Sequence, residues 1–378
     1  MMKKKSMMLC MLVYFFVANF HVMAQKSSKN LYGGLEFRNI GPAMTSGRIA
    51  DIAIHPENEN VWYVAVGSGG VWKTMNSGTT WKPIFDNQKV YSTGCITIDS
   101  KKPSTIWLGT GENVGGRHAG FGDGVYVSHN DGKSWKNMGL ENSEHISKII
   151  VHPENSDIVW VASQGPLWSK GGDRGVYKTI DGGKSWRRTL GDAAWVGATD
   201  MLIDPTNSDV LYAATWQRHR TVAGYLGGGP GSGLHKSIDG GETWKALKNG
   251  IPSSNLGKTG LAMSPFNSNV IYAALEFDRT KGGVYMTTNG GESWSKQSNA
   301  VSGGTGPHYY QEIIASPHHE GTIFFMNNSA LISKDHGKTF TNMSRSNQHS
   351  DSHALVFKKS DPNYLLIGTD GGLYESFD

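Results

Sequence analysis

Thr179-Ile-Asp-Gly-Gly-Lys-Ser-Trp186 is one of six copies of a single eight-residue motif, and this repeat indicates the fold. The other copies span Thr74–Trp81, Ser128–Trp135, Ser237–Trp244, Thr287–Trp294 and Ser333–Phe340. Their closing aromatic residues follow one another at intervals of 54, 51, 58, 50 and 46 residues. A period of this size, made of short β-rich segments, is typical of the blades of a β-propeller.

The third position of the motif is either Asn or Asp. The residues are Asn76, Asn130, Asp181, Asp239, Asn289 and Asp335. A metal ligand or a catalytic acid would not tolerate that exchange, whereas a side chain that accepts backbone N–H groups in a tight turn would. Every copy has glycine at its fifth position, which suits a left-handed turn residue. The closing aromatic ring offers a large apolar surface that can pack between neighbouring blades. We therefore interpret the motif as a structural hairpin that identifies the fold and not the function.

A second repeat, a proline turn followed by a β-rich strand, occurs seven times. Its prolines are Pro56, Pro103, Pro153, Pro205, Pro265, Pro317 and Pro362. Together the two repeats predict an all-β fold, a seven-bladed β-propeller with four antiparallel strands in each blade. For the first blade we expect strands A to D at Ile49–Ile54, Val61–Val66, Gly70–Thr74 and Thr80–Phe85.

The order of these repeats predicts two different faces of the disc. The proline turn joins strands A and B, and the motif joins strands C and D, so both hairpins are expected on one face. The B–C loops and the links between blades are expected on the other. Only six D strands follow a motif. We expect the seventh to be Leu35–Ile40, which directly precedes the first strand A and would close the ring without an exposed sheet edge.

Residues 1–24 have the pattern of a secretory signal peptide: Lys3, Lys4 and Lys5, then an apolar run, then a small residue, Ala24, at the expected cleavage site. The run is too short for a membrane span. We expect a secreted, periplasmic or cell-surface protein with a linker at 25–34 and the propeller at 35–378. The last three residues, Ser376-Phe377-Asp378, begin a seventh motif, so we also expect the chain to be truncated and a further C-terminal region to follow.

Charge and cysteine content narrow the class of protein. Without the three lysines of the leader, the 36 basic residues fall to 33, against 32 acidic ones. A nearly neutral chain argues against nucleic acid as a partner. Cys95 is the one cysteine that remains after cleavage, so no internal disulfide is expected. Its apolar neighbours place it on an inner strand, as a small hydrophobic residue.

Functional residues of a propeller are expected on long loops that rigid strands hold in place. The longest expected B–C loops are 109–124, 163–175 and 215–233, and we predict that their face carries the binding site. Glu112 and Asp370 are the candidate catalytic carboxylates, because each begins such a loop beside glycines. The alternative is that both accept loop N–H groups. The candidate ligand-binding residues are Arg48, Arg117, His118, Trp216, Arg218, His308, Tyr309, His349, Asp351 and His353.

Among these candidates, His349, Asp351 and His353 form the cluster with the most regular spacing. In an extended segment, residues two apart point to one face of the strand, so the three side chains can reach a common ligand. Two histidines and a carboxylate suit a transition metal, a polar ligand, or a solvated channel lining. We leave these alternatives open and assign no metal and no cofactor.

The motif resembles the Asp-box of the neuraminidase-repeat and sortilin-type propellers. That resemblance extends to Phe37–Arg48 and to Gly368–Gly372, and it implies an exported bacterial protein of this kind. The related xyloglucan-active glycosidases carry a catalytic Asp in a Thr-Asp-x-Gly-Gly type loop of an early blade. Here the first blade has Gly67-Ser68-Gly69-Gly70 instead, and Asp370 stands in a similar loop of the last blade.

The predicted function is binding of a peptide or a glycan through the face of the B–C loops. The alternative is a glycoside hydrolase of the xyloglucanase type that uses a carboxylate pair on the same face. We expect no nucleic-acid partner and no membrane span.

Overall fold

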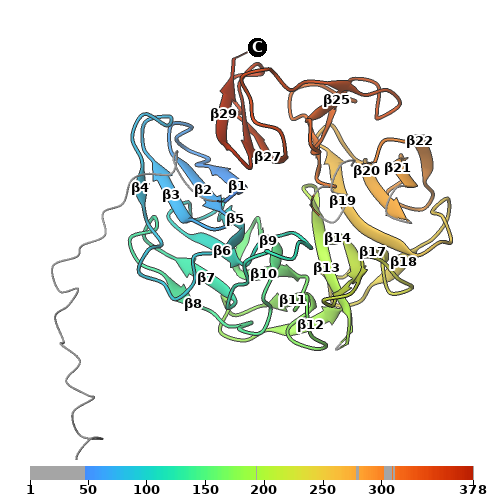
Figure 1. Cartoon of the computed structure of the whole chain (residues 1–378), viewed down its shortest axis with the longest axis horizontal. Helices are drawn as coiled ribbons and strands as arrows, with labels where there is room; N and C mark the ends of the chain where they lie inside the picture. Colours follow the sequence, from blue (N-terminus) through green and yellow to red (C-terminus); the bar gives the residue numbers. More distant parts are fainter. Residues whose placement is uncertain (1–46, 193, 278–280, 302–308, 310, 378) are drawn as a thin grey trace, which may run out of the picture. The chain divides into compact units, whose positions relative to one another are not determined.

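The computed structural model describes residues 47–192, 194–277, 281–301, 309 and 311–377. All regular elements in these ranges are β-strands, and they form seven sheets and one small hairpin within the unit Gly41–Asp378. Figure 1 shows the sheets arranged as blades around a common centre, with the first strand of each blade innermost. The prediction of an all-β, seven-bladed propeller is confirmed.

The first three blades each have four strands in antiparallel order. Blade 1 contains β1 (Ile49–Ile54), β2 (Trp62–Val66), β3 (Gly70–Thr74) and β4 (Lys82–Pro83). Blade 2 contains β5 (Thr93–Ile98), β6 (Ile106–Thr110), β7 (Val125–Ser128) and β8 (Lys136–Asn137). Blade 3 contains β9 (Ile146–His152), β10 (Asn155–Ser163), β11 (Gly175–Thr179) and β12 (Arg187–Leu190).

The remaining blades follow the same plan with two differences, an inserted hairpin and a shorter last sheet. Blade 4 contains β13 (Val196–Asp204), β14 (Asn207–Gln217), β17 (Gly233–Ser237) and β18 (Lys245–Leu247), with the hairpin β15 (His219–Arg220) and β16 (Tyr225–Leu226) inserted. Blade 5 contains β19 (Leu256–Ser264), β20 (Asn267–Phe277), β21 (Lys281–Thr287) and β22 (Ser295–Ser298). Blade 6 contains β23 (Ile313–Ala315), β24 (Ile323–Phe325), β25 (Leu331–Ser333) and β26 (Thr341–Asn342). Blade 7 contains β27 (Ser352–Phe357), β28 (Leu365–Thr369) and β29 (Gly372–Ser376).

The strands expected for blade 1 agree closely with those observed. β1 and β3 have the predicted bounds, and β2 begins one residue later. β4 is shorter than the predicted Thr80–Phe85, because the N–H of Thr80 bonds to Asn76 Oδ1 within the turn. The expected D strand of blade 7, Leu35–Ile40, lies outside the described residues.

The six motifs form one hydrogen-bonded turn. In the third copy, the N–H of Gly183 donates to Thr179 Oγ1 (2.9 Å), and the N–H of Ser185 donates to Asp181 Oδ1 (2.9 Å). An Asn copy makes the same bond at the same length, from Thr80 N–H to Asn76 Oδ1 (2.9 Å). Asn and Asp exchange freely because both supply that oxygen, which supports a structural role.

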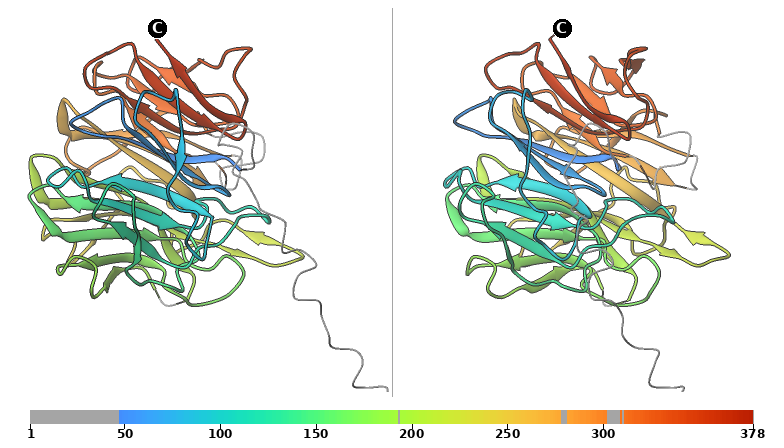
Figure 2. Two further views of the ribbon diagram at one scale, coloured as in Figure 1. Left: turned by 90° about the vertical axis from the view of Figure 1, so that its left-hand side faces the viewer. Right: turned by 60° about the vertical axis from the view of Figure 1, so that its left-hand side comes forward.

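Hydrogen bonds between turns fix which segments share a face. The motif turn bonds to the proline turn of its own blade, as in Asp131 N–H to Ser104 O, and five further blades repeat this contact. On the other side, B–C loops bond to the links between blades, as in Gly122 N–H to Glu144 O. This second side is called the loop face below. Figure 2 shows the yellow-green β15–β16 hairpin projecting beyond the neighbouring loops.

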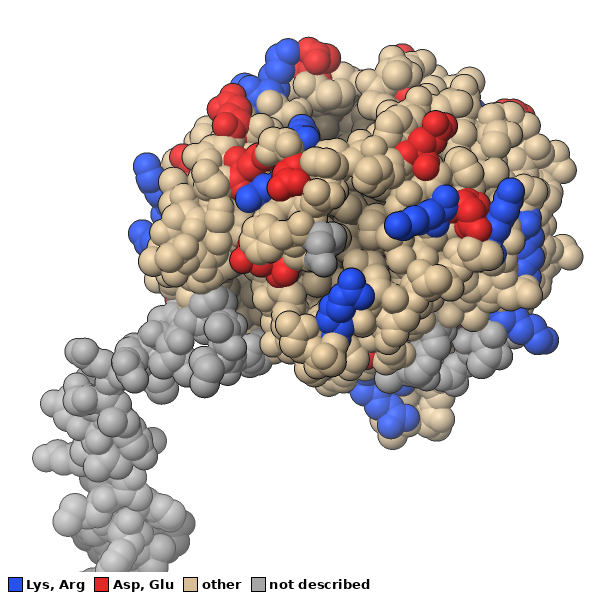
Figure 3. Space-filling view, turned by 90° about the horizontal axis from the view of Figure 1, so that it is seen from above, with Lys and Arg blue, Asp and Glu red and all other residues tan. Residues whose placement is uncertain are grey.

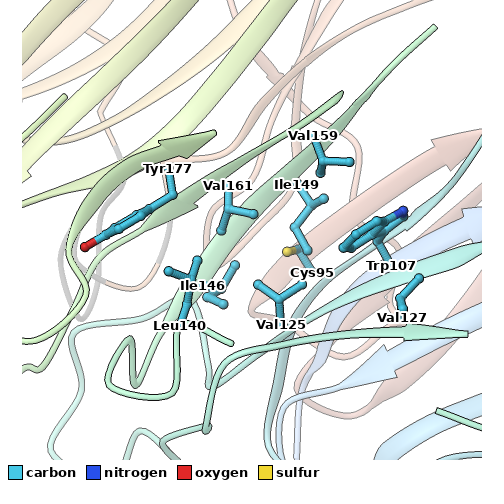
Figure 4. Close-up of a cluster of buried hydrophobic side chains, with 10 residues drawn as sticks. All are labelled: Cys95, Trp107, Val125, Val127, Leu140, Ile146, Ile149, Val159, Val161 and Tyr177. Atoms are coloured by element: carbon cyan, nitrogen blue, oxygen red, sulfur yellow. The ribbon is translucent and has the colours of Figure 1, made fainter. Parts of the chain in front are cut away.

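Apolar side chains from adjacent blades form the core. Figure 4 shows one such cluster, in which Cys95 and Trp107 of blade 2 pack with Ile149 and Val159 of blade 3. The closing residue Trp186 also packs here, edge-on to Trp107 at a ring-centroid distance of 6.3 Å. The aromatic residues of the motif therefore lie between blades, as predicted.

Blades 7 and 1 share a core in the same way. Ile49, Trp62 and Val64 of blade 1 pack with Tyr364 and Leu366 of blade 7. This contact brings the two ends of the described chain together. Among the described residues no helix has the length and apolar character needed to cross a membrane. Figure 3 views the unit from above and shows basic and acidic residues interspersed.

Candidate functional site

The site is built where three elements end on the loop face. Arg48 directly precedes β1, Glu112 follows β6, and Asp370 follows β28. The N–H of Asp370 donates to Asp351 O (3.1 Å), which fixes this loop to the link before β27. Gly111 has φ +83°, and a Cβ there would collide with Glu144 O. Only glycine fits this close approach, and the next residue, Glu112, extends its side chain to Arg48.

Arg48 is the centre of the cluster because its guanidinium reaches three side chains. Nη1 forms an ion pair with Glu112 Oε2. Nε donates to Asp370 Oδ1 (3.2 Å), and Nη2 lies 2.9 Å from His118 Nε2. The side chains of Arg48 and Glu112 are 10% and 3% exposed, whereas that of Asp370 is 38% exposed. Glu112 is therefore held inside, and Asp370 faces the solvent.

Three further side chains support these groups. Ser68 Oγ donates to Glu112 Oε1 (2.9 Å), and His353 Nε2 lies 2.7 Å from Asp370 Oδ1. The ring of Tyr309 lies below the Arg48 guanidinium at 5.7 Å, and its hydroxyl is 3.3 Å from His118 Nδ1. Arg48, Glu112, Asp370, His118, His353 and Tyr309 are called the Arg48 cluster from here on.

The neighbours of Asp370 set its protonation. Partial burial alone would raise the pKa of this carboxyl. The hydrogen bond and charge of His353, together with the charge of Arg48, outweigh burial and hold the pKa below its ordinary value. Asp370 is therefore ionised at neutral pH, which suits a hydrogen-bond acceptor, a base or a nucleophile rather than a proton donor.

Glu112 and Asp370 are neighbours, since both contact one guanidinium group. A pair of glycosidase carboxyl groups stands about 5 to 9.5 Å apart, a span that two ligands of one guanidinium can have. In this arrangement Arg48 forms an ion pair with each of the two carboxylates. Catalysis by this pair would require substrate to displace part of that contact.

The central channel below the cluster is a polar cavity of about 340 Å³. Asp51 Oδ2 accepts the N–H of Ile96 (2.9 Å) from the next blade, and Asp200 Oδ2 accepts the N–H of Leu261 (2.8 Å). Burial raises the pKa of both carboxyls, and the charge of Lys148 acts in the opposite direction. These groups link adjacent blades, so we interpret the channel charges as structural.

The structure brings together half of the twelve predicted site residues. Arg48, Glu112, Asp370, His118, His353 and Tyr309 meet in one cluster, although they come from four blades. Arg117 is exposed beside His118. His308 lies outside the described residues.

Two expected ligand-binding residues are buried instead. Trp216 lies in β14 rather than in a loop, is 1% exposed, and donates from Nε1 to Gly227 O (2.9 Å). Arg218 is 0% exposed and donates to Val114 O and Gly165 O, both at 3.0 Å. The expected loop 215–233 is in fact a longer strand and a hairpin; Trp216 bonds within this segment, and Arg218 holds it to neighbouring loops. Neither residue faces a ligand.

The triplet His349, Asp351 and His353 does not converge. His353 bonds to Asp370, Asp351 Oδ1 accepts from Asn328 Nδ2 (2.6 Å), and His349 is exposed. Asp351 has φ +65°, so the segment is not the regular strand that an alternating pattern requires. In the described part of the chain, no three His, Cys, Asp or Glu side chains form a group that could hold a metal ion. This arrangement does not support the metal alternative for the triplet.

Sequence analysis missed Ser68. It occupies the loop position in blade 1 that Asp370 occupies in blade 7, as the matched segments Gly67–Gly70 and Thr369–Gly372 show. Aligning the B–C loops of all blades, rather than looking for carboxylates, would have found it.

Comparison with known proteins agrees with this architecture. A family model described as "Sortilin, neurotensin receptor 3" (Sortilin-Vps10) matches residues 123–258. The oligoxyloglucan-reducing end-specific xyloglucanase of Emericella nidulans is 22% identical over 249 residues, which are 60% of this chain and 27% of that protein. The chain thus spans about a quarter of the length of this curated relative.

Two solved structures share the fold. The GH74 xyloglucanase from Xanthomonas campestris superposes with a TM-score of 0.66 at 14% identity, covering 91% of this chain and 54% of that one. YCF48 bound to D1 peptide superposes with a TM-score of 0.58 at 14% identity, covering 90% and 97%. The seven-bladed ring and its repeated turns are thus similar to those of sortilin-type and xyloglucanase-type propellers.

Proposed function

We propose that the loop face binds a glycan and that the Arg48 cluster is the centre of the site. The observation that carries this proposal is the convergence of six polar and aromatic side chains, from residues 48 to 370, at one mouth of the channel. Propellers commonly place ligands over such a mouth, on loops that the blades hold rigidly.

The chemistry of the cluster suits a neutral polyhydroxylated ligand. Asp370 is ionised and partly exposed, so it can accept hydrogen bonds from sugar hydroxyls. His118 and Tyr309 add a polar edge and an aromatic ring, whose centroids are 5.7 Å apart. Arg48 is balanced by two carboxylates, so the cluster presents little net positive charge to an anionic ligand. The xyloglucanase relatives support a glycan over a peptide.

Hydrolysis of the bound glycan is a second candidate, favoured by the sharing of one guanidinium between Glu112 and Asp370. A glycosidase pair needs one carboxyl group that donates a proton to the leaving oxygen. Asp370, whose pKa is lowered, would then be the base or nucleophile, and Glu112 would be the acid. Because Arg48 contacts both groups, we propose binding ahead of hydrolysis.

Calorimetric titration of the chain with xyloglucan oligosaccharides tests the proposal, and release of new reducing ends measures hydrolysis in the same samples. Asp370→Asn should weaken binding at least tenfold. The matched control is Asp335→Asn, which changes a carboxylate in a motif turn on the opposite face. Equal affinity of both variants for xyloglucan would overturn the proposal. Binding of extended peptides but of no glycan would assign the face to a peptide ligand instead.

We also propose that the chain is exported, on the basis of the leader-like residues 1–24. Expression of the full sequence in a bacterium, followed by mass measurement of the N-terminal peptide, tests this. A product that begins at Gln25 supports export, and an intact leader contradicts it.

A further inference from the structure

The loop that carries Glu112 and His118 is rich in glycine and is held by side chains of other blades. Seven of its sixteen residues, 109–124, are glycine. Glycine loses more conformational freedom on folding than any other residue, so a loop of this composition needs strong contacts to keep one conformation. Residues 114–116 of this loop are buried, whereas His118 is exposed. The contacts of the buried part therefore decide where the exposed part lies.

Four consecutive carbonyl groups of this loop, at residues 112–115, each contact a buried polar side chain from elsewhere in the ring. The four side chains come from the link before blade 3 and from blades 4 and 5, and each is at most 7% exposed. We call residues 112–115 the anchored segment. The pairs are His145 Nδ1 with Glu112 O (2.9 Å), Lys258 Nζ with Asn113 O (3.1 Å), Arg218 Nη1 with Val114 O (3.0 Å) and Arg220 Nη2 with Gly115 O (2.8 Å).

The four anchors differ in charge. Burial lowers the pKa of His145 to about 3, so its imidazole is neutral at pH 7. A carbonyl oxygen only accepts hydrogen bonds, so His145 Nδ1 carries the proton in this contact. Lysine and arginine donate charge-assisted bonds, which are about twice as strong as neutral ones. The three cations therefore contribute most to holding the anchored segment.

Arg220 has the firmest hold on this segment. Its Nε and Nη2 atoms both donate to Gly115 O, at 3.1 and 2.8 Å. One reason for such contacts is that a buried irregular loop must find donors for its carbonyl groups. A single donor would satisfy Gly115 O, and two donors from one planar guanidinium also fix its direction.

Gly116 connects this anchor to the Arg48 cluster. A Cβ at Gly116 would collide with the Tyr309 hydroxyl and come within 3.2 Å of His118 Cε1. The backbone beside Gly115 thus packs directly against the two side chains that give the cluster its polar edge and its aromatic ring. Those two side chains also contact each other, and His118 Nε2 lies 2.9 Å from Arg48 Nη2. A displacement of Gly115 O would therefore move both rings.

The β15–β16 hairpin holds Arg220 in turn. Arg220 pairs with Tyr225 across the hairpin, and its guanidinium lies 4.3 Å from the centre of the Tyr225 ring. Its backbone N–H donates to Leu167 O in the B–C loop of blade 3 (2.9 Å). Val222, near the tip of the hairpin that projects in Figure 2, is 89% exposed. The base of the hairpin is thus bonded to neighbouring loops, and its tip extends into solvent.

We propose that Arg220 is a positioning residue of the ligand site, which orients His118 and Tyr309 toward a bound glycan through Gly115 O. The β15–β16 insertion of blade 4 then belongs to the site, although it contributes no residue to the Arg48 cluster. This inference rests on the proposed glycan-binding function. Holding the two rings in place before the ligand arrives lowers the ordering cost of binding, so the effect appears in affinity.

Substitution of Arg220 tests the proposal. Arg220→Met removes both donors to Gly115 O and keeps a side chain of similar length. Calorimetric titration with xyloglucan oligosaccharides should show an affinity about fivefold lower than that of the parent. Arg220→Lys retains a positive charge and a donor for Gly115 O, so it should recover part of the lost affinity.

The matched control is Arg174→Met. Arg174 is 0% exposed and also donates to backbone carbonyl groups, but none of these belongs to the loop 109–124. Both substitutions leave buried carbonyl groups without donors, so Tm should fall by a similar amount in the two variants. The affinity of Arg174→Met for xyloglucan oligosaccharides should equal that of the parent. The Arg174 acceptors are Pro166 O, Ser169 O, Gly171 O and Trp195 O.

The imidazole of His118 reports the same effect without a ligand. Its resonances in a ¹H–¹⁵N NMR spectrum are identified by their loss in His118→Gln. They should shift in Arg220→Met and stay in place in Arg174→Met. This measurement separates the inference from the proposed function. Equal xyloglucan affinities of Asp370→Asn and Asp335→Asn would contradict glycan binding, whereas the shift of His118 would still support a positioning role for Arg220.

Two results would overturn the proposal. One is an unchanged His118 resonance in Arg220→Met, and the other is an equal loss of affinity in Arg220→Met and Arg174→Met. Either would mean that Arg220 serves stability alone. If Arg220→Met does not fold, Gly116→Ala decides, because it keeps the bonds of Arg220 and adds a methyl group against the Tyr309 hydroxyl. Gly116→Ala should shift His118 and weaken binding, and parent-like values of both would also overturn the proposal.

Discussion

Replacing Arg48 by methionine should destabilise the ring strongly while leaving its shape intact. The guanidinium is the ion-pair partner of Glu112, whose side chain is 3% exposed. Removing it leaves an almost fully buried carboxylate whose remaining side-chain hydrogen bond comes from Ser68. Breaking a buried pair in this way costs about 3–5 kcal/mol, because the remaining charge is not compensated.

The size of the effect is best measured with a double-mutant cycle. Glu112→Gln alone leaves Arg48 bound to Asp370, which is partly exposed, so its cost should be smaller, about 1–3 kcal/mol. The double variant has no uncompensated buried charge and should be more stable than Arg48→Met alone. The coupling energy should then be about 1–3 kcal/mol. Denaturant unfolding at pH 7, followed by tryptophan fluorescence, measures all four proteins.

The control in this cycle is Lys101 with Glu154, an ion pair at 2.6 Å whose side chains are 53% and 72% exposed. Surface pairs contribute about 0–1 kcal/mol, so Lys101→Met should change stability little. Strictly additive costs of Arg48→Met and Glu112→Gln would refute the reasoning, because they would mean that the two side chains do not form a buried pair.

Three further predictions concern the turns, the solvent-facing carboxylate and the seams between blades. Asp239→Asn should change the free energy of unfolding by no more than about 1 kcal/mol, since Oδ1 still accepts the N–H groups of the turn. Asp239→Ala should cost more, because it removes that acceptor. Equal large losses from both variants in thermal unfolding would indicate a requirement for charge. Asp370 has a lowered pKa in the folded state, so its stabilising contribution is present above its unfolded pKa of about 3.9 and is lost as pH falls through the folded value. The stability difference between the parent and Asp370→Asn should therefore narrow in acid, and a difference that grows below pH 4 would contradict this assignment. Phe85→Ala removes a ring that is 1% exposed and stands edge-on to Tyr126 and Trp135, at centroid distances of 5.1 and 5.4 Å. The change should lower the free energy of unfolding in urea by about 3–5 kcal/mol. A loss below about 1 kcal/mol would show that the side chains between blades 1 and 2 repack.

The fold could be predicted from sequence because its signals are local. The motif and the proline turn mark both ends of each hairpin, so the bounds of β1 and β3 follow from residues that are themselves in the turns. The alternating Asn and Asp residues revealed a structural role, because only a shared oxygen atom explains their exchange. Such signals depend on neighbours in the chain and need no knowledge of tertiary contacts.

The interpretation of blade 4 failed for the opposite reason. Trp216 stands among Arg218, His219 and Arg220, and a charged segment of this kind suggests an exposed loop. The Arg218 guanidinium is buried all the same, because carbonyl groups of Val114 and Gly165, far away in sequence, accept its hydrogen bonds. A charged residue in a sequence predicts exposure only when no distant backbone group can accept its hydrogen bonds, and the order of residues along the chain does not reveal such groups.

The convergence of the Arg48 cluster was predictable in outline, because ring closure makes blades 1, 2 and 7 neighbours. The central role of Arg48 was not, since a sequence gives no distances between side chains. Geometry also changed the interpretation of Glu112 and Asp370. As isolated loop carboxylates they suggested catalysis. In the structure both form ion pairs with the Arg48 guanidinium, so their first role is to hold that cation.

Ring closure and ligand binding should therefore be coupled. Arg48 belongs to the segment that leads into blade 1, while Asp370 belongs to blade 7, so the cluster exists only when the seam between these blades is closed. A ligand that bridges the two side chains binds the closed ring better than an opened one, and it should raise Tm in proportion to RT ln(1 + [L]/Kd). By the same linkage, Leu366→Ala, which loosens the core shared by blades 7 and 1, should weaken binding of xyloglucan oligosaccharides although it lies outside the cluster. Calorimetry on this variant and on the parent measures this directly. Unchanged affinity in Leu366→Ala, together with a lowered Tm, would show that the site forms independently of the seam.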